Sequence, residues 1–401
     1  MIFSGKNMVK KRLFFILLLL ASYPAVCAIL ITPALPQLST DLHLTKAMAQ
    51  LLVAVFLVGY TFGFLPYGPL ANRFGRRPVT IYAVIFALVG ALISVVGAYG
   101  KNLYLLYLGR LICGLGSSVG LKMAFTYISE LFPAKEIAGR IAYMSLSFAI
   151  GPSISVVIGG WLTSCFGGDA CFIMIFTYSL LILYLSGKLP ETLQEQNKTP
   201  LVLTNIYNGY ASKFSNKVLV IASILLGSST SFVYCFASFA PFVAIKHIGL
   251  TPEQYGSLNF IPPIGMISGF FINQYMKSRL KPITQLKLGI SIAGGFSFLM
   301  YLFFICGFVN PYSLFLFIPG VYLGTSIIFA NSSSLALGSD KNKSNASAII
   351  SFINMFICSA VLFLSERSKY DFPSFLPLVF LILTTGMIFL WIALKKNLKD
   401  V

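Results

Sequence analysis

Long apolar runs separated by short polar stretches dominate this chain of 401 residues. A helix needs about 20 predominantly apolar residues to cross a bilayer, and twelve runs are close to that length or longer. These runs span 13–33, 47–70, 78–98, 103–129, 137–163, 170–188, 217–245, 254–276, 284–308, 311–336, 344–365 and 373–394. The pattern predicts an all-α integral membrane protein with twelve transmembrane helices.

The first apolar run follows Lys10, Lys11 and Arg12 and continues to about Thr32. The apolar core of a signal peptide has about 7–15 residues, so this run is too long for one. We therefore expect an uncleaved first helix.

A short motif occurs twice, once in each half of the chain. Gly68, three residues, Asn72 and a basic cluster end the second run. Gly269, three residues, Asn273 and a basic cluster end the eighth run. Repetition of this kind indicates that the chain is built from two related units.

One long polar connection, residues 189–216, separates six runs from six. We therefore expect two pseudo-symmetric six-helix halves, 1–188 and 217–401, joined by a cytoplasmic linker. Such halves with a cavity between them are typical of alternating-access transporters. A duplicated bundle without a transport role is the alternative.

Composition and charge agree with a membrane protein. The chain is 57% hydrophobic and 10% charged, whereas a soluble domain has about 25% charged residues, so an ordinary soluble enzyme is excluded. The net charge is +18, and the Lys and Arg residues gather in the loops of one side, as the positive-inside rule requires. We expect a monomer in the cytoplasmic (inner) membrane, with both termini in the cytoplasm, a lipid bilayer around it and no nucleic-acid partner.

The basic cluster after the second run carries the first family resemblance. It reads Gly68-Pro-Leu-Ala-Asn72-Arg73-Phe-Gly75-Arg76-Arg77 and resembles the motif between the second and third spans of the major facilitator superfamily. Asn72 stands where that family usually has Asp. The resemblance implies that the Arg residues engage carboxylates and helix C-termini and hold an inner gate. A gating role is predicted for Gly68, Asn72, Arg73, Gly75, Arg76, Arg77 and the acidic residue that ends the fourth run, Glu130.

Further motifs are similar to the Bcr/CflA drug-resistance group of that superfamily. The fifth run carries Gly151-Pro152 and then Gly159-Gly160, which is similar to the antiporter motif and implies a conformational role. Stretches of the second half that are similar to this group are Ala240-Pro241-Phe242, 249–256 and 345–348. The major facilitator fold is thus expected, with Bcr/CflA-like efflux of a small drug or metabolite by secondary active transport and protons as a coupling ion.

Two cations lie within the fourth run, Arg110 and Lys122. Ionisable residues inside a membrane are costly and by default suggest function. A guanidinium without a counter-charge favours a carboxylate or phosphate, so both residues are predicted to bind substrate. The alternative function is transport of an organic anion such as a carboxylate siderophore, in either direction. As an alternative, Arg110 has a structural role and binds backbone carbonyls. For Lys122 the alternative is that its long side chain extends to the inner membrane–water interface.

Polar amides also occur within the predicted spans. Asn259 and Asn331 are predicted to contact substrate, with interhelical hydrogen bonding as the alternative. Pro262 and Pro263 predict a bend in the eighth span, because proline removes a helical hydrogen bond.

The acidic residues are placed at the membrane surfaces. Ile29 stands where the Bcr/CflA pattern has an Asp that is linked to proton handling. All eleven acids are predicted to lie in loops or at helix ends, with Glu366 at an outer helix end. No buried carboxylate that could carry a proton is therefore expected.

Residues for catalysis or metal binding do not occur together in this sequence. His43 and His247 lie in predicted outer loops, no cluster has metal-ligand spacing, and no nucleotide-binding loop occurs. We expect no enzyme activity, no metal and no cofactor. Cys165 and Cys171 flank an outer loop. The sequence leaves two alternatives for this pair, a disulfide or two free thiols.

Overall fold

The computed structural model describes residues 2–340, 342–367 and 372–398. Within this part of the chain every regular element is a helix. The helices of the first half are α1 (Ile2–Ile29), η1 (Thr32–Ala34), α2 (Leu35–Asp41), α3 (Lys46–Gly63), α4 (Tyr67–Phe74), α5 (Arg76–Tyr99), α6 (Leu103–Ser117), α7 (Val119–Leu131), α8 (Ala134–Phe166) and α9 (Ala170–Ser186).

A connection and a second half follow. The connection holds η2 (Glu195–Asn197) and α10 (Leu203–Phe214). The helices of the second half are α11 (Lys217–Pro241), η3 (Phe242–His247), α12 (Pro252–Leu258), α13 (Pro262–Met276), α14 (Pro282–Ile305), α15 (Pro311–Leu316), α16 (Ile318–Gly338), α17 (Lys343–Glu366) and α18 (Phe375–Asn397).

The twelve predicted runs correspond to these helices singly or in consecutive pairs. Nine helical segments in the described residues are long and apolar enough to cross a bilayer, and Ile150–Phe166 and Ala170–Ser186 are shorter apolar helices. The remaining run is α12–α13, which breaks after Leu258 and restarts at Pro262. The helix is therefore interrupted where the sequence predicted a bend. Pro262 and Pro263 begin α13, where a missing N–H costs no helical hydrogen bond.

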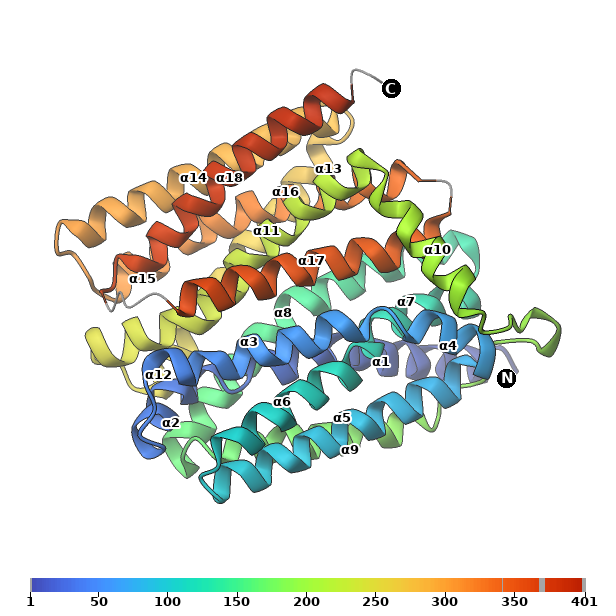
Figure 1. Cartoon of the computed structure of the whole chain (residues 1–401), viewed down its shortest axis with the longest axis horizontal. Coiled ribbons are helices and arrows are strands. Elements are labelled where there is room, and N and C mark those ends of the chain that lie inside the picture. The colour runs from blue at the N-terminus through green and yellow to red at the C-terminus, as the bar shows by residue number, and fades with distance from the viewer. Residues whose placement is uncertain (1, 341, 368–371, 399–401) are drawn as a thin grey trace.

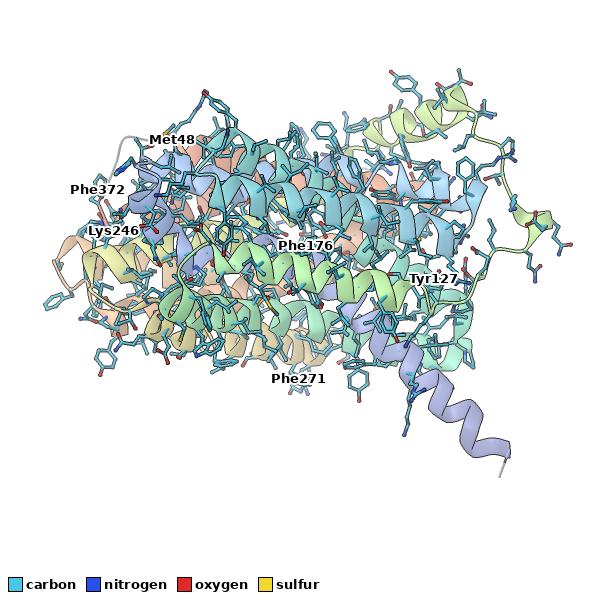
Figure 2. All side chains as sticks on the ribbon, turned by 90° about the horizontal axis from the view of Figure 1, so that it is seen from below. Met48, Tyr127, Phe176, Lys246, Phe271 and Phe372 are labelled. Atoms are coloured by element: carbon cyan, nitrogen blue, oxygen red, sulfur yellow. The ribbon has the colours of Figure 1, made fainter. Side chains whose placement is uncertain are left out.

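Both chain ends lie at one end of the bundle (Figure 1). We call this end, which also carries α10, the terminal face, and the end with α2, η3 and α15 the distal face. Figure 2 shows Met48 and Lys246 at the distal end and Tyr127 toward the terminal end. Each long helix runs between these faces, as spans of a membrane protein do.

Glycines let the helices of the first half approach closely. A Cβ at Gly114 would lie 2.2 Å from the backbone oxygen of Phe56, and one at Gly59 would lie 2.2 Å from that of Leu111. The backbones of α3 and α6 are therefore in direct contact. Small residues at helix crossings are the usual means of tight packing in membranes.

The two halves meet along two helix pairs, α3 with α17 and α8 with α12. At the distal face, Nε2 of Gln50 donates to the carbonyl of Ser238 at 3.1 Å, and Nζ of Lys246 donates to Oγ of Ser39 at 2.9 Å. Thus distal ends of the two halves are hydrogen-bonded to each other.

The connection touches both halves at the terminal face. The hydroxyl of Tyr210 in α10 donates to the carbonyl of Leu65 at 3.0 Å, on the first-half side. Nζ of Lys213 lies 3.0 Å from Oδ1 of Asp340, on the second-half side. Helix α10 is therefore a bridge between the halves as well as a link in the chain.

The disulfide left open by the sequence is not formed. Cys165 is exposed and Cys171 is buried, and both are free thiols. Sγ of Cys171 instead lies 3.7 Å from the carbonyl of Gly159 and 3.5 Å from Oγ1 of Thr163. The buried thiol packs inside the first half, facing away from the loop.

Candidate functional site

The chain reverses direction between α4 and α5 at Gly75. This residue has φ of +104°, a conformation that side chains with a Cβ rarely adopt. A Cβ there would also lie 2.4 Å from Oε2 of Glu191. Glycine at this position therefore lets α5 begin at Arg76 with a carboxylate against its first turn.

A cluster of charged and polar side chains forms around this turn. We call it the terminal cluster, and it consists of Asn72, Arg76, Glu130, Glu191 and Thr192. Nη1 of Arg76 donates to Oδ1 of Asn72 at 2.7 Å, and Nη2 lies 3.0 Å from Oε1 of Glu130. Oγ1 of Thr192 donates to the other oxygen of Glu130. The Arg76 guanidinium thus joins the end of the second span to the end of the fourth.

Glu191 was not predicted as a site residue, yet it completes the terminal cluster. Its two oxygens accept the backbone N–H groups of Arg76 at 2.9 Å and Arg77 at 3.1 Å, which are the unpaired donors at the start of α5. Burial works to raise the pKa of this carboxyl, but backbone N–H donors outweigh it and hold the pKa below its ordinary value. These donors belong to Leu193, Arg76, Arg77 and Thr192. The sequence offered one signal for this role. Glu191 comes shortly after the sixth run, on the same side of the predicted membrane as the start of α5.

The other predicted gating residues border the terminal cluster. Nη2 of Arg77 donates to the carbonyl of Gly187 at 2.7 Å, which attaches α5 to the end of α9. Arg73 is exposed in the last turn of α4. Gly68 faces Lys122, because a Cβ on Gly68 would lie 2.5 Å from Nζ of that lysine.

The second half has a cluster of neutral amides at the end of its second span. Asn273, the repeat of Asn72, accepts a hydrogen bond from Nδ2 of Asn331 at 2.7 Å. The same nitrogen lies 2.9 Å from the carbonyl of Ile327 and 3.3 Å from Oε1 of Gln285. Asn331 therefore links α13, α14 and α16, which is the interhelical role that the sequence left open.

Arg110 is buried, with 1% of its surface exposed, and donates to three backbone carbonyls. Nη1 reaches Cys27 at 2.6 Å, Nη2 reaches Ala28 at 3.1 Å and Nε reaches Leu52 at 3.0 Å. Cys27 and Ala28 lie in the last turn of α1, where helix carbonyls lack intrahelical donors and the helix dipole is negative. The guanidinium also lies over the ring of Phe56, 4.5 Å from its centroid. Arg110 therefore caps α1 and joins it to α3 and α6.

The four residues predicted to bind substrate each hydrogen-bond to a different part of the protein. Nζ of Lys122 donates to the carbonyl of Phe64 at 3.2 Å, in the break between α3 and α4. Arg110 donates to Leu52, twelve residues or about 18 Å earlier along α3. Asn259 is buried and donates to the carbonyl of Tyr255 on its own helix at 2.7 Å. Each of the four has a hydrogen-bond partner within the protein.

The glycines of the fifth run face different halves. A Cβ on Gly159 would lie 2.0 Å from the backbone oxygen of Leu30, in its own half. A Cβ on Gly160 would lie 2.4 Å from the backbone oxygen of Pro252, in the other half. A Cβ on Gly151, next to Pro152, would lie 3.2 Å from the side-chain Cβ of Ser22 in α1. Helix α8 thus makes main-chain contact with both halves through two adjacent residues.

One acid overturns the expectation that no carboxylate is buried. Glu366 ends α17 and has only 2% of its surface exposed. The sequence placed it at a helix end, and it does lie there, but α11 covers it: Oγ of Ser238 donates to its Oε1 at 3.2 Å. A position beside the loop therefore did not make this side chain accessible to water.

A groove of about 510 Å³ lies between α14 and α18. Its lining includes Lys287, Gly294, Gly295, Thr384 and Trp391. None of the residues predicted from the sequence lines it. The groove is therefore separate from the terminal cluster and from the contacts between the halves.

Comparison with known proteins places the fold and the motifs in a family. The family model described as "Major Facilitator Superfamily" matches residues 14–365. A bicyclomycin resistance protein homolog of Haemophilus influenzae is 24% identical over 71% of this chain and 72% of its own length. Multidrug resistance protein D of Escherichia coli is 21% identical over 81% of both chains. The chloramphenicol resistance protein CraA of Acinetobacter baumannii is 22% identical over 92% of this chain and 90% of its own.

Solved structures share the architecture at lower identity. A crystal structure of the D-xylose-proton symporter superposes with a TM-score of 0.73 at 16% identity, covering 95% of this chain and 97% of that one. The POT family transporter PepTSo superposes with a TM-score of 0.74 at 12% identity, covering 97% and 98%. The expected fold, twelve helices in two six-helix halves, is confirmed.

Proposed function

Because this chain belongs to the Major Facilitator Superfamily, a family of membrane transporters rather than of enzymes, we propose that it exports a small drug or metabolite across the cytoplasmic membrane. The protein is a multi-pass membrane protein with drug-resistance relatives. In our proposal it acts as a monomer and as a secondary active transporter. The terminal face, with both termini, is the cytoplasmic one.

Transport in this proposal proceeds by alternating access between two units. Residues 1–188 rock against residues 217–401, with 189–216 as the linker, and the substrate passes between them. Support comes from the contacts of the two halves, which run along α3 with α17 and α8 with α12 and hold the distal face together. Breaking a few hydrogen bonds there is a smaller change than rearranging either half.

The observation that carries the proposal is the bonding of Arg76 in the terminal cluster. Its side chain joins Asn72 and Glu130, and the carboxylate of Glu191 binds the start of α5. These contacts tie the ends of the second and fourth spans and the linker into one unit. A latch of this kind stabilises one arrangement of the gate, and its release accompanies the other arrangement.

The bonding of Arg110 favours drug or metabolite efflux over transport of an organic anion. The anion hypothesis required that the Arg110 guanidinium has no partner within the protein and is free to bind an anionic substrate. Three donors of Arg110 are instead used by carbonyls of α1 and α3. Binding of substrate by Arg110, Lys122, Asn259 or Asn331 stays a prediction, and each residue also has a bond within the protein.

The experiment is transport by the purified chain in proteoliposomes. Radiolabelled chloramphenicol is supplied outside the vesicles, on the side of the terminal face. The vesicle interior, on the distal side, is made acidic so that protons leave as the substrate enters, and lipophilic cations and organic carboxylates are added as competitors. We expect uptake that depends on the gradient and is reduced by the cations. Uptake of a carboxylate instead would favour the anion alternative, and no gradient-driven movement of any panel member would contradict the proposal.

One variant changes the latch and a second serves as its control. Glu130→Gln keeps the size of the side chain and removes the charge that binds Arg76, so the transport rate is expected to change. The control is Glu195→Gln, which changes an acid of the linker outside the terminal cluster. Glu195 pairs with the nearby Lys198, so this variant is expected to leave the transport rate unchanged.

A further inference from the structure

Glu366 is buried at the distal face with half of its carboxylate unsatisfied. Oε1 accepts a hydrogen bond from Ser238, but Oε2 is buried and has no partner in the described part of the chain. A buried polar atom without a partner costs about 1–3 kcal/mol, and more when it carries charge. The surroundings of Oε2 therefore suit a neutral acid better than a carboxylate.

The charged and titratable groups around Glu366 come from several elements. Tyr107 of α6 and Cys235 of α11 are titratable groups near it, and the Tyr107 hydroxyl donates to the carbonyl of Met48. Nζ of Lys46 in α3 lies 5.9 Å from the ring centroid of Phe239. On its own helix, Arg367 lies over the ring of Phe363, at 4.8 Å. No ion pair joins Glu366 to a described cation.

Ser238 connects this carboxyl group to the contact between the halves. Its hydroxyl donates to Glu366 and its carbonyl accepts Nε2 of Gln50, so one residue of α11 holds α17 on one side and α3 on the other. Gln50 has only 1% of its surface exposed. Separation of α3 and α11 at the distal face breaks the Gln50–Ser238 bond and uncovers the side of α11 that binds Glu366.

We propose that Glu366 is a proton-binding site that couples the pH on the distal side to closure of the distal face. This inference rests on the proposed function. When the halves are apart there, hydronium from the distal solution gives its proton to Oε2, an O–H bond forms, and water leaves. Closure then buries a neutral acid. When α3 and α11 separate, Glu366 gives the proton back to water of the distal solution, which becomes hydronium; the hydrated carboxylate then keeps the Gln50–Ser238 contact open.

The test measures the distance between the halves at the distal face. Tyr104 in α6 and Tyr312 in α15 are 84% and 82% exposed and lie in opposite halves. Spin labels on Tyr104→Cys and Tyr312→Cys, in a background where the exposed Cys165 and Cys306 are Ser, report this distance in nanodiscs. The pH is varied from 5 to 9.

In the parent we expect the ratio of closed to open distances to rise as the pH falls, by up to about tenfold per pH unit, the limit for one proton. Glu366→Gln mimics the neutral acid, so the closed distance should dominate at every pH with less than about a twofold change in the ratio. Glu253→Gln removes an exposed acid of the same face and should behave as the parent. A pH response that survives in Glu366→Gln, or is absent in the parent, overturns the proposal.

A second measurement does not depend on the fold of Glu366→Gln. Ser238→Ala keeps the acid but removes the hydrogen-bond donor to Oε1. The distance should still respond to pH, with the midpoint of closure moved to higher pH. An unchanged midpoint contradicts the role of Ser238. Addition of chloramphenicol at constant pH tests the proposed function separately, because it should shift the distance whether or not Glu366 binds the proton.

Discussion

Nη1 of Arg110 lies 2.6 Å from the carbonyl oxygen of Cys27 and joins the fourth span to the last turn of the first. Two other carbonyls, those of Ala28 and Leu52, accept the remaining bonds of this side chain. A cation at the C-terminal end of a helix is stabilising. The first half is therefore held together at a buried point by one side chain.

Arg110→Ala is expected to lower the stability of the protein. Removal of the side chain leaves buried carbonyls without these donors, at about 1–3 kcal/mol for a group left unsatisfied. Arg110→Lys keeps a positive charge but not the fork of donors, so its loss should be smaller. Thermal unfolding in detergent measures both.

The control for these variants is Arg73→Ala, at an exposed position, which should leave the unfolding temperature unchanged. An Arg110→Ala protein with parental stability and no substrate binding would contradict the capping role and return Arg110 to the substrate site.

Asn72→Asp is expected to strengthen the terminal cluster. Oδ1 of Asn72 already accepts Nη1 of Arg76 at 2.7 Å, and a carboxylate there would add a charge–charge attraction of about 0.2–1 kcal/mol. The arrangement with the latch formed should become more populated and the transport rate should fall. Gradient-driven transport in proteoliposomes measures the rate.

The double variant Asn72→Asp/Glu130→Gln tests whether the two carboxyl positions act through Arg76. We expect it to transport faster than Asn72→Asp alone. Strict additivity of the two single effects would show that they are independent.

Gly75→Ala is expected to destabilise the turn between α4 and α5. Gly75 has φ of +104° and ψ of 157°, a conformation that essentially only glycine adopts and that costs about 1–3 kcal/mol in a residue with a Cβ. The added Cβ also meets Oε2 of Glu191 at 2.4 Å. The Gly75→Ala/Glu191→Ala double variant removes this second contact, so thermal unfolding should show partial recovery relative to Gly75→Ala/Glu191→Gln.

A matched control is Gly295→Ala in α14, where a new Cβ meets nothing within 4 Å. Because alanine is the better helix former, this variant should be neutral or slightly stabilising. Equal losses at the two glycines would contradict the role of the turn.

Acid is expected to loosen the start of α5. The pKa of Glu191 is held below its ordinary value by backbone N–H donors, so the charged form is bound more tightly in the folded protein. Its contribution is fully present above the pKa of the unfolded chain, about 4.3, and is lost as the pH falls through the lower folded pKa. Hydrogen exchange of a peptide containing Arg76 and Arg77, corrected for intrinsic rates, should therefore accelerate below about pH 4.

Glu191→Gln supplies the comparison for this pH effect. Its peptide should exchange faster than the parent's at neutral pH, and the difference should shrink in acid. A constant difference across the pH series would assign the protection to something other than the carboxylate.

The sequence predicted the spans because a bilayer requires long apolar segments, and the bend at Pro262 because proline acts locally. It did not predict Glu191, whose partners are backbone groups 114 and 115 residues earlier. Arg110 is buried, in line with its depth along the fourth run, but which carbonyls it meets depends on how α1 and α3 pack. The burial of Glu366 was missed for the same reason, because α11 covers a residue that the sequence correctly placed at a helix end.

The adjacent glycines of α8 have a consequence for how this protein can evolve. Gly159 meets the main chain of Leu30 and Gly160 meets the main chain of Pro252, so this joint is made of backbone on both sides. At these two points the distance between helices is set by backbone atoms, so substitutions of the side chains around them do not change it directly. Under the proposed function, mutations elsewhere in the chain can alter the substrate while the packing of α8 against both halves is inherited unchanged.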